Sequence, residues 1–183
     1  MKEYVVGVTG ASGICYARKL LEVLCADATV HVIVSDVAKR IAAHEGVDLT
    51  GFAAEYHKND KMFAKIASGS YRYDGMVIIP CSQKTLAAIA NGYGDNLITR
   101  TADVCLKERR PCILVPREMP LSEIHIRNML AAHRAGATIM PASPPFYHRP
   151  ETIDDLVDMV VARILDHLGV EHMLAERWGG ADA

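Results

Sequence analysis

Short loops that follow five apolar runs carry the side chains best suited to bind a phosphate. The loops are residues 10–13, 35, 80–85, 116–118 and 141–147, and each consists mainly of small, hydroxylated or charged residues. Small residues allow the backbone to approach an anion, and helices that begin at Ser12 or Ser82 offer unpaired N–H groups. Lys84 and Arg117 can add charge-assisted hydrogen bonds. Any one loop is explained equally well as a turn or a helix cap, but five together predict one continuous site.

The apolar runs predict the sheet that must hold these loops together. They cover residues 4–9, 29–34, 76–80, 112–115 and 137–140, and helical patterns follow at 13–26, 36–44, 85–91, 96–110, 122–135 and 152–168. Short β-branched runs that alternate with helices are typical of βα units, and continuous apolarity is typical of strands covered on both faces. We therefore expect an α/β fold, a three-layer Rossmann-like or flavodoxin-like single domain over residues 1–183 with a parallel sheet flanked by helices.

The expected sheet explains why the loops matter, because ligands of such sheets bind beyond the carboxyl ends of the strands. All five loops fall at that edge. Residues 45–74 fit the pattern least, and one helix is expected there, near 61–68.

Composition and charge argue against several other classes of protein. Half of the 183 residues are hydrophobic and the formal net charge is −2, which gives no field of the kind that binding to nucleic acid or an anionic membrane requires. No apolar stretch reaches the ~18 residues of a membrane span, and no secretion signal is recognised. The five cysteines are scattered and include no C-x-x-C pair. These features predict a reduced, cytoplasmic protein.

Two patterns suggest metals that we do not expect. The eight histidines form no H-E-x-x-H or H-x-x-x-H cluster, so the sequence predicts no zinc site. Asp154, Asp155 and Asp158 spell the D-D-x-x-D pattern of isoprenoid synthases. Here the acids open an amphipathic helix capped by Thr152, where the helix dipole explains them without a metal.

The glycines of the first loop leave an alternative open. Gly7-x-x-Gly10-x-x-Gly13, followed by Asp36, resembles a dinucleotide fingerprint and would suit an NAD(P)-linked reductase. The match is not the strict G-x-G-x-x-G, and no Tyr-x-x-x-Lys is present, so this reading is the weaker one.

Taken together, the loops resemble those of the UbiX-type flavin prenyltransferases, and the resemblance covers nearly the whole chain. It rests on motifs in the same order: Thr9–Gly13, Pro80–Ala87, Asn96–Pro111, Val115–Glu118, Pro141–His148 and Val161–Leu165. It implies transfer of a dimethylallyl group from dimethylallyl phosphate to N5 and C6 of reduced FMN, with release of phosphate. The prenylated FMN would be delivered to a UbiD-type decarboxylase. The resemblance also implies a homo-oligomer, a dodecamer, whose sites are completed by neighbouring subunits.

Carried over residue by residue, the resemblance assigns three groups of side chains. FMN would be held by Gly10, Ala11, Ser12, Ser35, Ser82, Gln83, Lys84, Thr85 and Arg117. Dimethylallyl phosphate would be held by Tyr147 and Arg163, and the reaction centre would contain Glu45, Arg100, Lys107 and Glu118. Trp178 matches a further family position, and it is explained equally well as an anchor for the C-terminal tail. The segment between Glu45 and Tyr73 is shorter than in the family.

The chemistry of an allylic phosphate explains why these residue types are needed. Lys107, Arg100 and Arg163 could stabilise the departing phosphate, and the Tyr147 hydroxyl could donate to it. Glu118 and Glu45 could transfer protons.

Two other functions would use the same FMN loops. One is an FMN-binding decarboxylase of the peptidyl-cysteine class, whose proline-alanine-serine loop partly resembles Pro141–Ser143. The other is a non-catalytic flavin carrier or accessory subunit of an aromatic acid decarboxylase. The sequence leaves open whether the donor is the monophosphate or the diphosphate, and which decarboxylase receives the product.

Overall fold

One parallel sheet of six strands forms the centre of the protein. The computed structural model describes residues 1–175, and the strands lie in the order β3-β2-β1-β4-β5-β6. They are β1 (Glu3–Val8), β2 (Thr29–Val34), β3 (Glu55–His57), β4 (Gly75–Cys81), β5 (Cys112–Pro116) and β6 (Thr138–Ile139). Every pair of neighbours is parallel. The strand order reverses between β1 and β4, which is the point where open α/β sheets bind their ligands.

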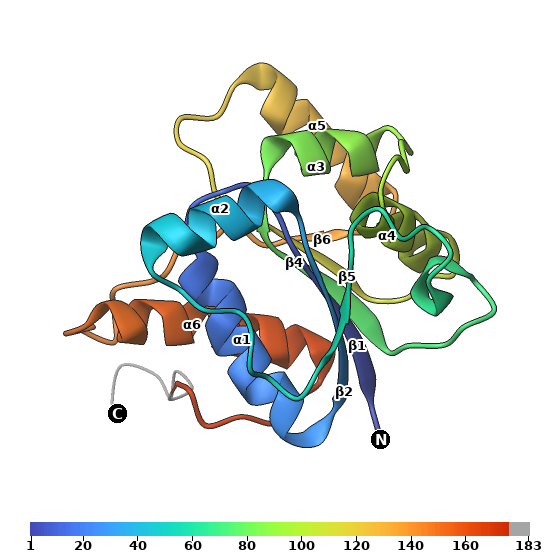
Figure 1. Cartoon of the computed structure of the whole chain (residues 1–183). Coiled ribbons are helices and arrows are strands. Elements are labelled where there is room, and N and C mark those ends of the chain that lie inside the picture. The colour runs from blue at the N-terminus through green and yellow to red at the C-terminus, as the bar shows by residue number, and fades with distance from the viewer. Residues whose placement is uncertain (176–183) are drawn as a thin grey trace.

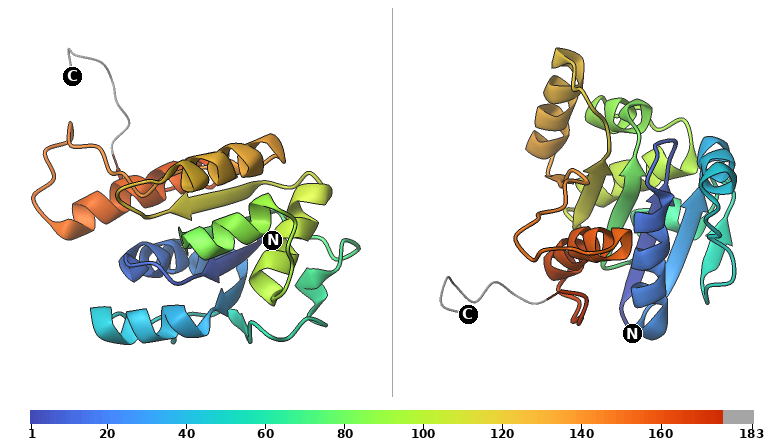
Figure 2. Two further views of the ribbon diagram at one scale, coloured as in Figure 1. Left: turned by 90° about the horizontal axis from the view of Figure 1, so that it is seen from above. Right: turned by 90° about the vertical axis from the view of Figure 1, so that its left-hand side faces the viewer.

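Helices cover both faces of this sheet. They are α1 (Ile14–Asp27), α2 (Asp36–Glu45), α3 (Gln83–Ala90), α4 (Leu97–Lys107), α5 (Glu123–Arg134) and α6 (Ile153–Leu168). Helices α1 and α6 lie side by side on one face (Figure 1). Helices α3, α4 and α5 lie on the other, and the further views show the layers from above and from the side (Figure 2).

The alternation of buried side chains along β1 shows how the two cores form. Tyr4, Val6 and Val8 pack with α1 and α6, whereas Val5 packs with α3 and α4 on the other face. Successive side chains of a strand point to opposite faces, so a strand that is covered twice must be apolar throughout. This confirms the α/β fold class and the five strands predicted from the apolar runs.

The structure corrects the prediction for residues 45–74. The helix expected at 61–68 is only a 3₁₀ turn at Lys65–Ala67, and strand β3 was not predicted. Phe63, which lies within the expected helix, is exposed. Strand β3 is a short, largely polar edge strand, so it lacks the apolar run by which the others were found.

The acidic start of α6 is a helix cap, as expected. Thr152 accepts a hydrogen bond from the Asp155 backbone N–H, and the Asp155 carboxylate accepts from the N–H of Thr152 at 2.8 Å. Asp158 pairs with Lys19 of α1 at 3.3 Å. Cap formation and this ion pair account for all but the first acid of the D-D-x-x-D pattern.

No helix among residues 1–175 is long and apolar enough to cross a bilayer.

Candidate functional site

The loops after β1 and β4 are joined through a buried threonine. Thr9 donates its hydroxyl to the carbonyl of Pro80 at 2.8 Å and accepts the N–H of Ser82 at 2.7 Å. The Ser35 N–H donates to the Val8 carbonyl, which holds the loop after β2 against the same strand end. Three of the five predicted loops therefore meet at the switch point of the sheet. The linking role of Thr9 was not predicted, although a threonine directly after an apolar strand is a recognisable sign of it.

Two of these loops begin helices in the way the sequence indicates. Ser35 accepts the N–H of Ala38 at the start of α2, and Ser82 accepts the N–H of Thr85 at the start of α3. The first amides of a helix have no acceptor within the helix, so the start of α3 presents the N–H groups of Gln83 and Lys84 beyond the sheet. The Lys84 ammonium itself is exposed and lies 4.0 Å from Asp95.

Cys81 lies between these groups but supplies no nucleophile. Its side chain is fully buried. Burial raises the pKa of the Cys81 thiol to about 12, so the thiol stays protonated at neutral pH.

The first loop is held by a carboxylate from the far end of α2. Glu45 accepts the backbone N–H groups of Gly13 at 2.9 Å and Ile14 at 2.8 Å. Burial opposes ionisation of Glu45, but these bonds, the Ser12 hydroxyl and the nearby Arg117 outweigh it and lower the pKa. The expectation that this helix start offers unpaired N–H groups is therefore wrong for Gly13 and Ile14. Glu45 organises the loop, a role that the sequence did not reveal.

The tightness of the same loop explains Gly10. A β-carbon placed there would lie 2.7 Å from Cγ1 of Val37 in the first turn of α2. Only glycine lets the backbone of this loop pass so close to α2.

We expect Glu45→Gln to lower the free energy of unfolding by about 1–3 kcal/mol, because charge-assisted bonds to two amides are weakened. The pKa of Glu45 is lower in the folded protein, so its contribution is present above the unfolded pKa and lost as the pH falls below about 4. Urea titrations at pH 7 and at pH 3.5 measure both effects. Glu22→Gln on α1 is the control, and an equal loss of stability in the two variants would contradict this role.

Buried polar atoms without partners show that the site fits a hydrogen-bonding ligand. Within residues 1–175, both amide atoms of Gln83 and the Nε of Arg117 are buried and have no hydrogen-bond partner. A buried polar atom left unsatisfied costs about 1–3 kcal/mol, so such atoms at a loop cluster indicate a group that binds there. Gln83 and Arg117 follow β4 and β5, at the carboxyl edge. A phosphorylated, heteroaromatic ligand such as FMN offers the acceptors that Arg117 requires and both partners for the amide of Gln83.

Glu118 and Tyr147 lie in exposed loops at this same edge. Glu118 follows Arg117 directly after β5, and its carboxylate accepts the N–H of Met119 at 3.2 Å. The Ala142 N–H donates to the Pro116 carbonyl, so the loop that carries Tyr147 starts beside the one that carries Glu118. The Tyr147 ring packs on His148 with 4.1 Å between centroids.

The remaining predicted cations do not join this cluster within one subunit. Lys107 ends α4 and pairs with Glu108 at 2.5 Å, next to Gly69 and close to the amino ends of the strands. Arg100 pairs with Asp103 on the surface of α4, at 2.9 Å. Arg163 pairs with Asp166 at 2.6 Å and lies about 15 Å along α6 from its start. Trp178 lies outside the described residues.

Comparisons with known proteins agree on one family. Residues 1–165 match the family model described as Flavoprotein. The chain is 48% identical over 179 residues to the flavin prenyltransferase UbiX of Methanocaldococcus jannaschii, which covers 96% of this chain and 97% of that protein.

Two solved structures are similar over almost the whole fold. The dodecameric FMN-dependent UbiX-like decarboxylase from Escherichia coli O157:H7 has a TM-score of 0.91 and 46% identity, with 97% of this chain and 100% of that chain covered. AnUbiX (PadA1), in complex with FMN and dimethylallyl pyrophosphate, has a TM-score of 0.91 and 43% identity, with 98% of each chain covered.

Proposed function

The chain belongs to the UbiX-type flavin prenyltransferases of the flavoprotein family, and from this membership we propose that it transfers a dimethylallyl group from dimethylallyl phosphate to N5 and C6 of reduced FMN. The protein is accordingly an enzyme that uses FMN, with prenylated FMN and phosphate as products. The observation that carries the proposal is the cluster at the carboxyl edge of the sheet. There Thr9, Ser35 and Ser82 fasten the loops together, and Gln83 and Arg117 present buried polar atoms without partners.

FMN binding falls to residues of the first four loops. The amides at the start of α3 and the side chains of Gln83 and Arg117 would bind polar atoms of FMN, while Gly10, Ala11, Ser12 and Ser35 shape the wall on the β1 side. Reduced FMN supplies the nucleophilic N5 and C6 atoms. Glu45 holds the loop at Gly13 in place for it.

The exposed loops after β5 and β6 would serve the dimethylallyl donor. The Tyr147 hydroxyl donates to the donor phosphate, and Arg163, Arg100 and Lys107 supply positive charge as the carbon–oxygen bond breaks. Glu118 follows Arg117 in sequence and is the carboxylate placed to act as general acid or base. It moves a proton between the flavin and the donor phosphate.

We further propose that neighbouring subunits of a dodecamer complete each site. The dodecameric relative supports this assembly. Lys107 and Glu118 belong to opposite ends of the sheet in one subunit, so they can meet only across an interface or after a large rearrangement. Exposed apolar side chains on and before α5 (Met119, Ile124, Ile126 and Leu130) are suited to such an interface.

The fate of the product and the compartment are also part of this proposal. Prenylated FMN would pass to a UbiD-type decarboxylase that uses it as cofactor. The five free cysteines suit the reducing cytoplasm, where reduced FMN can be supplied.

An anaerobic assay tests the proposed reaction. The purified protein is mixed with reduced FMN and dimethylallyl phosphate. The flavin is then extracted, and its mass is measured by mass spectrometry. We expect a prenylated flavin that is absent when either substrate is omitted. A decarboxylase is the second candidate, because one similar structure carries that name. Unmodified FMN with both the phosphate and the diphosphate donor would contradict transfer and favour a decarboxylase or a flavin carrier.

A further inference from the structure

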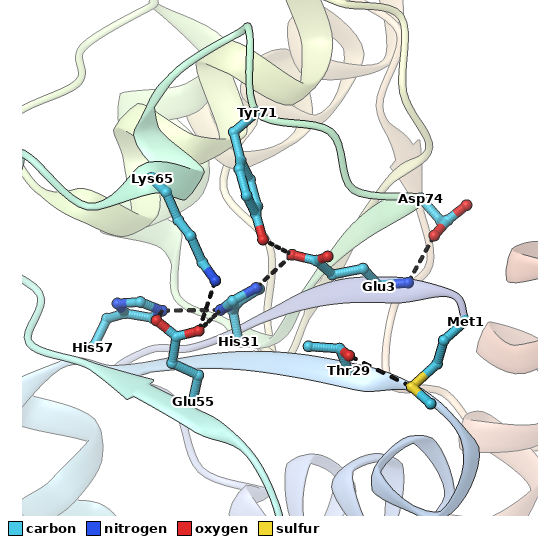
Figure 3. Close-up of polar contacts among 9 residues, drawn as sticks. All are labelled: Met1, Glu3, Thr29, His31, Glu55, His57, Lys65, Tyr71 and Asp74. Carbon is cyan, nitrogen blue, oxygen red and sulfur yellow. Dashed lines mark hydrogen bonds and ion pairs between the residues drawn. The ribbon is translucent and has the colours of Figure 1, made fainter.

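Four polar side chains of three neighbouring strands meet on one face of the sheet. They are Glu3 of β1, His31 of β2, and Glu55 and His57 of β3 (Figure 3). His31 is opposite Glu55 in the parallel register, and His57 lies two residues beyond Glu55, so all three project from the same face. His31 is fully buried in a strand that is otherwise mainly apolar. The proposed transfer reaction does not use it.

The structure assigns these residues a second site: we propose that His31, Glu55 and His57 bind one Zn²⁺ ion. The site goes beyond the prenyl transfer and takes no part in it. It departs from the sequence expectation of no zinc site, which rested on the distance between histidines along the chain. The parallel pairing of β2 with β3 brings these histidines together in space although they are far apart in sequence.

One ligand atom from each of His31, Glu55 and His57 lies within 4.8 Å of the other two, and the shorter separations come close to those around a tetrahedral ion. Nδ1 of His31 lies 3.0 Å from Nε2 of His57 and 3.4 Å from Oε2 of Glu55. Nε2 of His57 lies 3.6 Å from Oε1 of Glu55. Zinc bonds of about 2.0–2.2 Å place neighbouring ligand atoms about 3.3 Å apart. Two imidazole nitrogens and one carboxylate oxygen are a donor set that zinc accepts, with the fourth position left to solvent.

Glu3 and Tyr71 form the outer contacts that such a site needs. Nε2 of His31 donates to Oε1 of Glu3 at 2.6 Å, and the Tyr71 hydroxyl donates to the same oxygen. This bond keeps the proton of His31 on Nε2 and turns the lone pair of Nδ1 toward His57. His57 remains neutral by carrying its own proton on Nδ1 when Nε2 binds the ion.

When no metal is bound, the Lys65 ammonium supplies the positive charge beside Glu55. Its ammonium lies 2.8 Å from Oε2 of Glu55 and 5.0 Å from the ring centre of Tyr71. The side chains of Lys65 and Glu55 are 43% and 48% exposed, so Lys65 can move into solvent and an ion can enter past Glu55. The two carboxylates, of Glu3 and Glu55, against one ammonium leave a net negative charge that attracts the ion.

Zinc binding to the full-length protein tests the proposal. Bound metal is removed from the protein with a chelator, and the protein is dialysed and titrated with Zn²⁺. The amount of bound zinc per chain is then measured by elemental mass spectrometry. We expect one ion per chain and, with Co²⁺, the intense visible absorption of a tetrahedral site. The thermal midpoint should rise with Zn²⁺, because the assembled site of the folded chain binds the ion more tightly than the unfolded chain does.

Variants separate this site from zinc bound elsewhere, for example at cysteines. We expect His57→Gln and Glu55→Gln to weaken zinc binding at least about 10-fold, and Glu3→Gln to weaken it about 10–100-fold through His31. Lys65→Met should strengthen it, since the competing ammonium is removed. His44→Gln, an exposed histidine of α2, is the matched control and should bind zinc as the unchanged protein does.

Two results would overturn the site. One is the absence of stoichiometric zinc in the unchanged protein, which would leave a hydrogen-bonded cluster neutralised by Lys65. The other is equal binding by His57→Gln and His44→Gln. Glu55→Gln alters a half-exposed side chain, and circular dichroism confirms that its fold is kept. Prenyl transfer should persist in Glu55→Gln without zinc, so failure of this proposal and failure of the proposed function are distinguishable.

Discussion

Replacing Glu118 by Gln is expected to lower kcat for prenyl transfer by about 10²–10⁴-fold, the usual contribution of a general acid or base. The carboxylate follows Arg117 at the end of β5, is exposed, and accepts a hydrogen bond from the adjacent N–H of Met119 at 3.2 Å. Glutamine keeps the shape and an acceptor oxygen, but it cannot accept or release a proton at neutral pH. FMN affinity should be unchanged, because the loops that meet at Thr9 do not depend on Glu118.

The initial rate of prenylated-flavin formation, measured with FMN and donor in saturating excess over the enzyme, gives kcat and is the suitable readout. A separate titration of FMN fluorescence gives the affinity. Glu123→Gln is the matched control, since Glu123 is exposed on α5 nearby and pairs only with Arg127 in the described contacts. An unchanged rate in Glu118→Gln would remove Glu118 from the reaction.

Local patterns were sufficient for most of the sheet. Residues 29–34 were predicted as a strand and form β2 with the same bounds, because Val30, Val32 and Ile33 fill both cores and make the segment mainly apolar despite His31. The caps at Ser35, Ser82 and Thr152 were predictable for the same reason: each bonds an amide three residues away.

Contacts between distant segments were not predictable. Glu45 binds the amide of Gly13, 32 positions away, and β3 exists only because β2 offers it an unpaired edge. Helix α4 ends at Lys107, three residues before the predicted end, and Arg109 then adopts a left-handed backbone at φ 58°. For Glu45 and β3 the deciding partner is distant in sequence, so the periodicity of the local segment does not reveal it.

Sequence motifs also do not reveal which subunit would supply a predicted cation to a site. Motif order groups Lys107 with Glu118, yet the fold of one chain places Lys107 beside Gly69 and Glu108, near the amino ends of the strands. A residue type can be assigned to a site from sequence, but the subunit that delivers it depends on assembly.

Lys107→Ala is therefore expected to lower the transfer rate by about 10²–10³-fold without weakening FMN binding in the same subunit. This is the usual loss when one group that stabilises developing negative charge is removed. Stability should change little, because the pair with Glu108 is half-exposed and such pairs contribute at most about 1 kcal/mol. Arg109→Ala, an exposed cation at the same helix end, is the control and should retain full activity.

Mixed oligomers reveal which subunit supplies Lys107. Lys107→Ala and Glu118→Gln chains with different tags are co-expressed, and particles that carry both tags are isolated. If Lys107 acts on the neighbouring subunit, a site with an intact Glu118 can receive an intact Lys107 from a Glu118→Gln chain. Roughly one site in four should then recover in a random mixture.

Recovery cannot occur if both residues act within one chain, since every chain in the mixture lacks one of them. Activity as low as that of the separate variants would thus contradict the shared site and require α4 to rearrange within its own subunit. The two outcomes differ by orders of magnitude in rate, because a quarter of the sites at full activity far exceeds the residual activity of either variant. The mixing experiment therefore tests whether the proposed action of Lys107 on the donor phosphate depends on assembly or on rearrangement within one chain.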